Sequence, residues 1–312
     1  MTETEVNGPL KILFMGTPDF AAVSLKKLID GGFDVCAVIT QPDRVNARGN
    51  KVIPGAVKAY AESVGLPVYQ PASLKNGEAD AILAQYRPDI AVVAAYGKIL
   101  PRSVLEAPKL GCINVHASLL PAYRGASPIQ TAIVNGETES GVTIMQLDVG
   151  MDTGDMLAAV RVPIASDMTA GELFDELAQA GAELLAEVLP KLEKGEITPE
   201  KQDESKATYA PMISKEAANI DYNRSAKQVV DLVRGLNPNP VARTEINGCR
   251  IKVYRAGLGQ ATALPAGTAF EKDGGIAVAC GDGTEVLLRE VQGEGGKRMD
   301  SAAFLRGHRI FD

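Results

Sequence analysis

The chain has 312 residues, of which 46% are apolar and 23% charged, and its formal net charge is −7. This composition is that of a globular protein of about two domains, at roughly 100–200 residues each, and it excludes a long disordered tract. No apolar run reaches the roughly 20 residues that a membrane span needs. The start of the chain, residues 1–9, is polar and acidic and lacks the pattern of a secretory signal. We therefore expect a cytoplasmic protein without a membrane partner.

The first 200 residues alternate apolar runs with amphipathic stretches. Continuous Val, Ile and Ala runs are typical of parallel strands that are covered on both faces. The alternation predicts an α/β fold with an open, doubly wound, mostly parallel sheet. Thr169 and Glu172 form a capping-box pattern at the start of the longest predicted helix. Strands are predicted at Lys11–Met15, Val35–Thr40, Ile90–Ala95, Cys112–His116, Val142–Leu147 and Ala158–Val162, and helices at Asp19–Ile29, Ala56–Ser63 and Thr169–Leu192.

The composition changes after Gly195. Residues 199–214 are polar and show no period, which predicts a linker between domains 1–198 and 215–312. The second domain is predicted to be a small β-barrel with one helix, because short strands there are separated by Gly and Pro. Residues 210–312 carry 14 basic and 12 acidic side chains, against 18 and 27 before them, which is a weak indication of a polyanionic partner. The helix is predicted at Ala226–Leu236 and strands at Ile251–Arg255, Ile276–Ala279 and Glu285–Val291.

Two common kinds of site find little support in the sequence. The four cysteines, at 36, 112, 249 and 280, form no CxxC pair, so reduced core cysteines are favoured over a disulfide or a zinc site. Gly16-Thr17-Pro18 follows the first strand, but neither GxGxxG nor GxxxxGK[ST] occurs in the chain. Binding of NAD or ATP through these loops is therefore not indicated.

One of the two histidines stands where ligands bind in this class of fold. His116 ends a predicted strand, and doubly wound sheets bind ligands at the carboxyl ends of their strands. Asn114 lies two residues earlier, so its side chain points to the same face. A hydrogen-bonded histidine that closes the strand explains the pattern equally well at this point. His308 lies in a basic tail and is expected at the surface.

A second cluster is the acidic loop of residues 147–155, which contains Asp148, Asp152 and Asp155 between glycines. Its spacing is not that of an EF-hand. Three interpretations stay open on spacing alone: a metal site, a plain acidic loop, or a catalytic carboxylate held beside the histidine.

Four motifs together resemble the methionyl-tRNA formyltransferase family: FMGTPDFA (Phe14–Ala21), TQPDR (Thr40–Arg44), NVHASLLPAYRGASPIQ (Asn114–Gln130) and GVTIMQLDVGMDTGDM (Gly141–Met156). Their order and spacing agree with that family over roughly residues 10–160. Weaker similarity continues through TYAPMISKEAANIDY (Thr208–Tyr222) and LNPNPVA (Leu236–Ala242).

The resemblance implies a Rossmann-like catalytic domain and a C-terminal, OB-fold-like β-barrel that binds tRNA. It implies that Asn114, His116 and Asp152 form a catalytic trio. The implied reaction moves the formyl group of 10-formyltetrahydrofolate, a co-substrate, to initiator methionyl-tRNA, and a monomer without a metal is expected to perform it. The residues implied to bind the folate are Ser118, Leu119, Leu120 and Pro121, with Tyr96, Gly97, Ile99 and Leu100 as walls of the pterin pocket.

The resemblance places tRNA contacts on basic residues, and the chain departs from the family pattern at two of the places involved. The loop after TQPDR is often richer in lysine, whereas this chain has Asn50 there, and Met212 stands where a lysine is frequent. Both departures weaken the assignment of tRNA contacts in these two places, and neither changes a residue of the catalytic trio. The implied contacts are Arg44, Arg48, Lys51, Lys58 and Lys215.

Other functions remain as alternatives. A formyltransferase that acts on glycinamide ribonucleotide or on an amino sugar nucleotide would use the same trio, as would a formyl-folate hydrolase. The basic loop of residues 41–58 favours tRNA over these. A non-catalytic RNA-binding module would explain the charge asymmetry and the barrel but not the trio. A nicotinamide-dependent dehydrogenase is disfavoured because the chain lacks the phosphate-binding loop.

Overall fold

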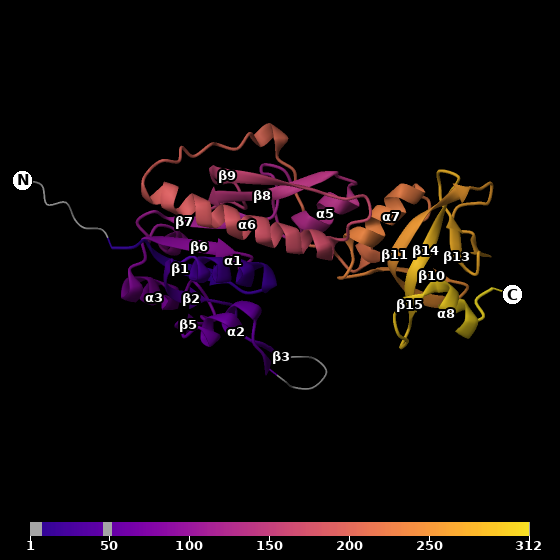
Figure 1. The fold of residues 1–312 in the computed structure, drawn as a ribbon, viewed down its shortest axis with the longest axis horizontal. Coiled ribbons are helices and arrows are strands. Elements are labelled where there is room, and N and C mark those ends of the chain that lie inside the picture. The colour runs from indigo at the N-terminus through magenta and orange to yellow at the C-terminus, as the bar shows by residue number, and fades with distance from the viewer. Residues whose placement is uncertain (1–7, 46–51, 312) are drawn as a thin grey trace, which may run out of the picture. The chain divides into compact units, whose positions relative to one another are not determined.

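The computed structural model describes residues 8–45 and 52–311 (Figure 1). The chain forms two compact units. The first comprises residues up to Ala126 together with Gly141–Val162 and Asp175–Tyr209, and the second comprises Ser127–Ser140, Pro163–Phe174 and Ala210–Asp312. Each unit therefore contains segments that are distant in sequence. The expected division at residues 198 and 215 stays a prediction.

A seven-stranded sheet in the order β5-β2-β1-β6-β7-β8-β9 forms the body of the first unit. The pairs β5–β2, β2–β1, β1–β6 and β6–β7 are parallel, and β8 runs antiparallel to β7. The predicted α/β class with a mostly parallel sheet is therefore confirmed. The strands are β1 (Lys11–Gly16), β2 (Asp34–Ile39), β5 (Val68–Tyr69), β6 (Ile90–Ala94), β7 (Cys112–His116), β8 (Glu139–Gln146) and β9 (Met156–Pro163).

Helices cover both faces of this sheet because its strands are apolar on both sides. Leu13, Met15 and Cys112 share a buried cluster with residues of α3 and α4. On the other face, a Cβ at Gly181 of α6 would lie 2.9 Å from the side chain of Val115, so this helix packs closely on β7. Alternation along β7 therefore puts Asn114 and His116 on the face of α3 and α4. The helices are α1 (Asp19–Asp30), α2 (Ala56–Ser63), α3 (Glu78–Tyr86), α4 (Arg102–Leu105) and α6 (Ala170–Glu193).

Local sequence explains some of these boundaries. The capping box at the start of α6 is present, since the Thr169 hydroxyl accepts from the amide of Glu172 at 3.3 Å and the Glu172 carboxylate accepts from the amide of Thr169 at 2.8 Å. Hydrogen bonds from the hydroxyl and amide of Thr169 lower the pKa of Glu172. The segment predicted as a long loop after β2 contains a short antiparallel hairpin, β3 (Arg44–Val45) with β4 (Val52–Ile53).

The C-terminal part is a separate antiparallel sheet in the order β10-β11-β14-β13-β12, with β15 paired to β14. Apolar side chains of α7 pack on this sheet, and Val229, Val233, Ile251 and Leu288 are among the buried members of the cluster. The elements are α7 (Ala226–Gly235), α8 (Ser301–Gly307), β10 (Ala242–Ile246), β11 (Cys249–Ala261), β12 (Ala269–Lys272), β13 (Gly275–Ala279), β14 (Thr284–Gly293) and β15 (Met299–Asp300), with α5 (Pro128–Val134) and a 3-10 turn at Glu216–Ala218 in the same unit. A further 3-10 turn, at Glu204–Lys206, belongs to the first unit.

Within residues 8–45 and 52–311, no helix is both long and apolar enough to cross a membrane. The four cysteines are free. Burial raises the pKa of Cys112 to about 12, so at neutral pH its thiol stays protonated in the sheet.

Candidate active site

His116 ends β7 and is buried, with 5% of its surface exposed. Its Nε2 lies 3.1 Å from the main-chain carbonyl of Tyr123. Because a carbonyl oxygen only accepts, Nε2 is the protonated nitrogen in this contact. The other ring nitrogen, Nδ1, faces the carboxylate of Asp152. Both nitrogens of the imidazole therefore have a defined neighbour.

Asp152 lies in the loop between β8 and β9, and its backbone has φ of 54°. Its Oδ2 accepts a hydrogen bond of 2.8 Å from the amide of Gly125. Its Oδ1 lies 3.7 Å from Nδ1 of His116, which is an ion-pair distance when the imidazole is protonated. The fold thus brings together two groups from separate motifs of the sequence.

Asn114 lies on β7 opposite Val93 of β6 and Met145 of β8. It is half-buried on the same face as His116. In the part of the chain that the structure describes, its side-chain amide has no hydrogen-bond partner. The amide is therefore available to a ligand at the end of the strand.

The acidic loop around Asp152 is held by its own side chains. The carboxylate of Asp148 accepts from the amide of Gly150 at 2.9 Å and from the hydroxyl of Thr153 at 2.7 Å. A Cβ at Gly154 would lie 1.9 Å from the carbonyl oxygen of Gln146, so glycine is required there by close backbone approach. No group of three metal-binding side chains is found among the described residues. Asp148 therefore acts as a structural residue of this loop.

The segment Ser118–Pro121, which the family resemblance implies to hold the folate, is hydrogen-bonded to Thr143 of the neighbouring strand β8. The Thr143 hydroxyl donates to the carbonyl of Ser118 at 2.7 Å and accepts from the amide of Leu120 at 3.1 Å. Thr143 is fully buried. Among the described residues, the amide of Leu119 and the carbonyl of Leu120 have no partner, so these two groups are available to a ligand.

The implied walls of the pterin pocket differ in exposure. Tyr96 and Leu100 are buried in the cluster beneath α3 and α4, while Ile99 is 79% exposed. The Tyr96 hydroxyl has no hydrogen-bond partner among the described residues, and burial raises its pKa to about 12. Gly97 has φ of 75° and turns the chain between them.

The basic residues implied to contact tRNA are spread over several places. Arg44 lies in β3, while Arg48 and Lys51 fall outside the described residues. Lys58 of α2 donates to Asp43 at 2.6 Å and to Gln70 at 2.9 Å, and hydrogen bonds from Lys58 and Gln70 lower the pKa of Asp43. Lys215 is exposed in the second unit. Lys58 is thus already engaged within the protein.

Sequence reasoning missed three residues that surround the site. Thr143 lies within a motif, but a single threonine in an apolar strand gives no local sign of its two bonds. Arg124 and Gln202 form a hydrogen-bonded pair 78 positions apart, and Gln202 donates to the carbonyl of Asp152 at 2.8 Å. Gln202 and Thr208 lie in the segment that is predicted as a linker, which stays a prediction, and both form hydrogen bonds with the loops of the site.

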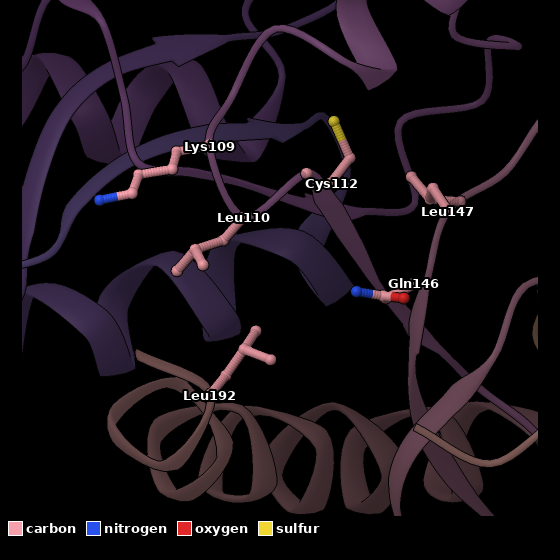
Figure 2. Close-up of a pocket in the computed structure, with 7 residues that line it drawn as sticks. Lys109, Leu110, Cys112, Gln146, Leu147 and Leu192 are labelled. Carbon is pink, nitrogen blue, oxygen red and sulfur yellow. The ribbon is translucent and has the colours of Figure 1, made fainter. Parts of the chain in front are cut away.

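A cavity of about 430 Å³ lies elsewhere in the first unit, at the start of β7 rather than at its end. Figure 2 shows Leu110 and Leu192 facing the same space, with Gln146 beside them. None of the trio lines it. The cavity is lined by Lys109, Leu110, Gly111, Cys112, Gln146, Leu147 and Leu192.

The comparisons with known proteins agree with this fold and these groups. The family model described as formyl transferase matches residues 10–189, and the model of the formyl transferase C-terminal domain matches residues 212–309. The chain belongs to the formyl transferase family.

Relatives found by sequence include methionyl-tRNA formyltransferases. That of Geobacter sulfurreducens is 46% identical over 301 residues, covering 96% of this chain and 95% of the relative. That of Trichlorobacter lovleyi is 47% identical over 298 residues, covering 96% and 94%.

Solved structures share the fold at lower identity. The N-formyltransferase from Helicobacter canadensis, in complex with folinic acid and dTDP-3-aminofucose, has a TM-score of 0.68 at 20% identity and covers 89% of this chain and 98% of its own. HypX from Aquifex aeolicus, in complex with tetrahydrofolic acid, has a TM-score of 0.63 at 18% identity, covering 96% of this chain and 47% of its own.

Proposed function

We propose that this protein transfers the formyl group of 10-formyltetrahydrofolate to the amino group of initiator methionyl-tRNA and forms N-formylmethionyl-tRNA. The observation that carries the proposal is the pairing of His116 with Asp152 at the end of β7, beside the side-chain amide of Asn114, which no other described residue binds. The names of the relatives at 46% and 47% identity support methionyl-tRNA as the acceptor.

The chemistry proceeds by direct attack. The amine nitrogen forms a bond to the formyl carbon, and the carbonyl electron pair moves to the oxygen. Asn114 donates to this oxyanion, and His116 supplies a second N–H when the substrate displaces one of its present neighbours. The oxyanion then re-forms the carbonyl and the bond to N10 breaks. Asp152 accepts the proton that the attacking nitrogen loses and passes it, through a water, to N10, so that N10 leaves protonated and the carboxylate is regenerated.

The reaction as written uses no metal. The carboxylates of Asp148 and Asp152 bind main-chain amides and the Thr153 hydroxyl, which is the bonding of a structured loop. The folate is held by Ser118–Pro121, through main-chain groups such as the Leu120 carbonyl, and by the turn Tyr96–Leu100.

The remaining proposals concern the whole protein. Residues 1–198 form the catalytic domain and 199–214 connect it to residues 215–312, whose antiparallel sheet closes into an OB-fold-like barrel that binds tRNA. Arg44, Arg48, Lys51, Lys58 and Lys215 contact the tRNA, and the protein acts as a cytoplasmic monomer.

One assay tests the function. The protein is incubated with 10-formyltetrahydrofolate and, in separate reactions, with initiator methionyl-tRNA, elongator methionyl-tRNA, glycinamide ribonucleotide or a dTDP-amino sugar. We expect formyl-methionine from the initiator tRNA, at an equal rate after dialysis against a chelator. Transfer to a small molecule alone would contradict the proposed acceptor, and a rate that returns only with added divalent ion would contradict the metal-free mechanism.

A further inference from the structure

Arg124 follows β7 in the loop that leads to Gly125, and its side chain is fully buried. A buried charge is costly unless it is paired and hydrogen-bonded. Glu204 accepts from Nη1 at 2.9 Å and from Nη2 at 2.7 Å, and Gln202 accepts from Nε at 3.0 Å and from Nη2 at 2.8 Å. The bonds to Arg124 lower the pKa of Glu204. Residues 200–209 thus neutralise a guanidinium that lies beside the candidate site.

The amide of Gln202 has a fixed orientation. Its Oε1 faces a guanidinium, which only donates, so its Nε2 must face the opposite way. There Nε2 donates to the carbonyl of Asp152 at 2.8 Å and to the carbonyl of Gly154 at 2.7 Å. Gln202 therefore holds the backbone of the acidic loop on one side and the buried guanidinium on the other.

Asp152 depends on such support. Its positive φ is uncommon outside glycine and persists where surrounding bonds hold it. Its carboxylate is held by the amide of Gly125, the residue after Arg124, and its carbonyl is held by Gln202. The 3.7 Å separation between Asp152 and His116 is set by these bonds.

The same segment binds the loop on the histidine side. The amide of Arg124 donates to the carbonyl of Thr208 at 2.8 Å, and the amide of Tyr123 donates to the Thr208 hydroxyl at 2.9 Å. Tyr123 is the residue whose carbonyl accepts from His116. Residues 200–209 thus fix both loops between which the trio lies.

We infer that Gln202 is a positioning residue for Asp152, and that Arg124 and Glu204 orient Gln202. The role rests on the proposed formyl transfer. Gln202 bonds a main-chain carbonyl and not the carboxylate, so it acts through Asp152. A displacement of a catalytic group by about 1 Å costs up to about 100-fold in rate.

The test changes the donor side of the Gln202 amide, which binds the acidic loop, and keeps the acceptor side, which binds Arg124. Gln202→Glu keeps an acceptor for Arg124 but loses both donors to the acidic loop and places a carboxylate oxygen against two carbonyls. We expect kcat for formyl-methionyl-tRNA to fall about 10- to 100-fold, with the KM for 10-formyltetrahydrofolate close to that of the wild type. The melting temperature should fall, because two carbonyls lose their donor, and circular dichroism at the assay temperature checks that the variant is folded. Glu200→Gln is the matched control, because it makes the reverse change on an exposed side chain of the same segment.

Two further measurements exclude a merely structural role. In an Asp152→Asn background, Gln202→Glu should lower kcat no further. A residue that acts only through the Asp152 carboxylate has no effect on the rate once that carboxylate is removed. Hydrogen exchange of the Gly125 amide, which is bonded to the Asp152 carboxylate, should accelerate in Gln202→Glu and stay unchanged in Glu200→Gln.

The outcomes are distinct. Any one of three results would overturn the inference. They are a wild-type kcat in Gln202→Glu, an equally large loss of kcat when Gln202→Glu is added to Asp152→Asn, and an unchanged exchange rate of the Gly125 amide. A wild-type protein that forms no formyl-methionine would instead contradict the proposed function, and the exchange measurement would still decide whether Gln202 positions Asp152.

Discussion

At the scale of single residues, the imidazole of His116 is oriented by one oxygen neighbour at each of its two ring nitrogens. The Tyr123 carbonyl requires a hydrogen on Nε2, and the Asp152 carboxylate is best served by a hydrogen on Nδ1. Each ring nitrogen therefore faces an oxygen that accepts hydrogen bonds, and a substrate oxygen that displaces the Tyr123 carbonyl would receive the N–H of Nε2. The chain offers a natural control in its other histidine, His308, which stacks on Phe304 in the second unit.

We expect His116→Ala to lower the rate of formyl transfer by at least about 100-fold, since an oxyanion donor is removed. The protein should stay folded, because the ring bonds a loop carbonyl at the carboxyl end of β7 and the strand pairs of the sheet are kept. His308→Ala should keep the wild-type rate. Steady-state kinetics and thermal unfolding of both variants check this, and equal rates for His116→Ala and the wild type would remove His116 from the mechanism.

Local patterns single out the members of the trio as candidates, and the family resemblance joins them in one site. Asn114 and His116 end an apolar strand, and Asp152 lies between loop glycines. Gln202 has no such pattern, since its partners lie 50 and 78 positions away. The role of Gln202 follows from hydrogen bonds to residues far away in the sequence, and composition and periodicity do not predict such bonds.

At the scale of elements, one threonine joins two of them. Thr143 of β8 bridges the carbonyl of Ser118 and the amide of Leu120, so the loop after β7 is bound to the neighbouring strand. Removing a hydroxyl that serves two buried main-chain groups leaves both unsatisfied.

We expect Thr143→Val to lower the free energy of unfolding by about 1–3 kcal/mol and to raise the KM for 10-formyltetrahydrofolate. Thr284→Val is a matched control on β14, where the structure shows no hydrogen bond from the hydroxyl to another described residue. Chemical denaturation and folate kinetics give the two readouts. A Thr143→Val protein with wild-type stability and an unchanged KM for the folate would show that the hydroxyl does not position the Ser118–Pro121 segment for folate binding.

The elements themselves were largely predictable where they are apolar and regular. The predicted strands at β1, β2, β6 and β7 agree with the structure within a residue or two, because buried parallel strands leave continuous Val, Ile and Ala runs. The two-residue strand β5 and helices α3 and α5 were missed. Strands this short carry no period, and their place is decided by pairing.

At the scale of the whole molecule, charge separates the two halves of the sequence. The residues before 210 are acidic in sum and those after are slightly basic. The segment of residues 41–58, with four basic and one acidic side chain, is a basic exception in the acidic half. A polyanion bound by this loop should therefore be held by specific phosphate contacts rather than by the overall field.

We expect Arg44→Ala with Arg48→Ala to raise the KM for methionyl-tRNA and to leave the KM for the folate unchanged. The slope of log affinity against log salt should become shallower by roughly 0.7–0.9 for each phosphate that the variant no longer neutralises, so the defect is largest at low salt. Lys26→Ala, an exposed lysine of α1, serves as control. Unchanged tRNA kinetics and salt slope would remove the loop from the tRNA contacts.

The burial of Arg124 also has a consequence for how the chain matures during synthesis. Arg124 and Glu204 are 80 residues apart. At roughly 5–20 residues per second, ribosomes need about 4–16 s to make that interval. Throughout this time the guanidinium has been made and its counterion has not, so a nascent chain cannot close its loops over an unpaired charge. The central strands can assemble as they emerge, while the site takes its final form only after residues 200–209 have left the ribosome.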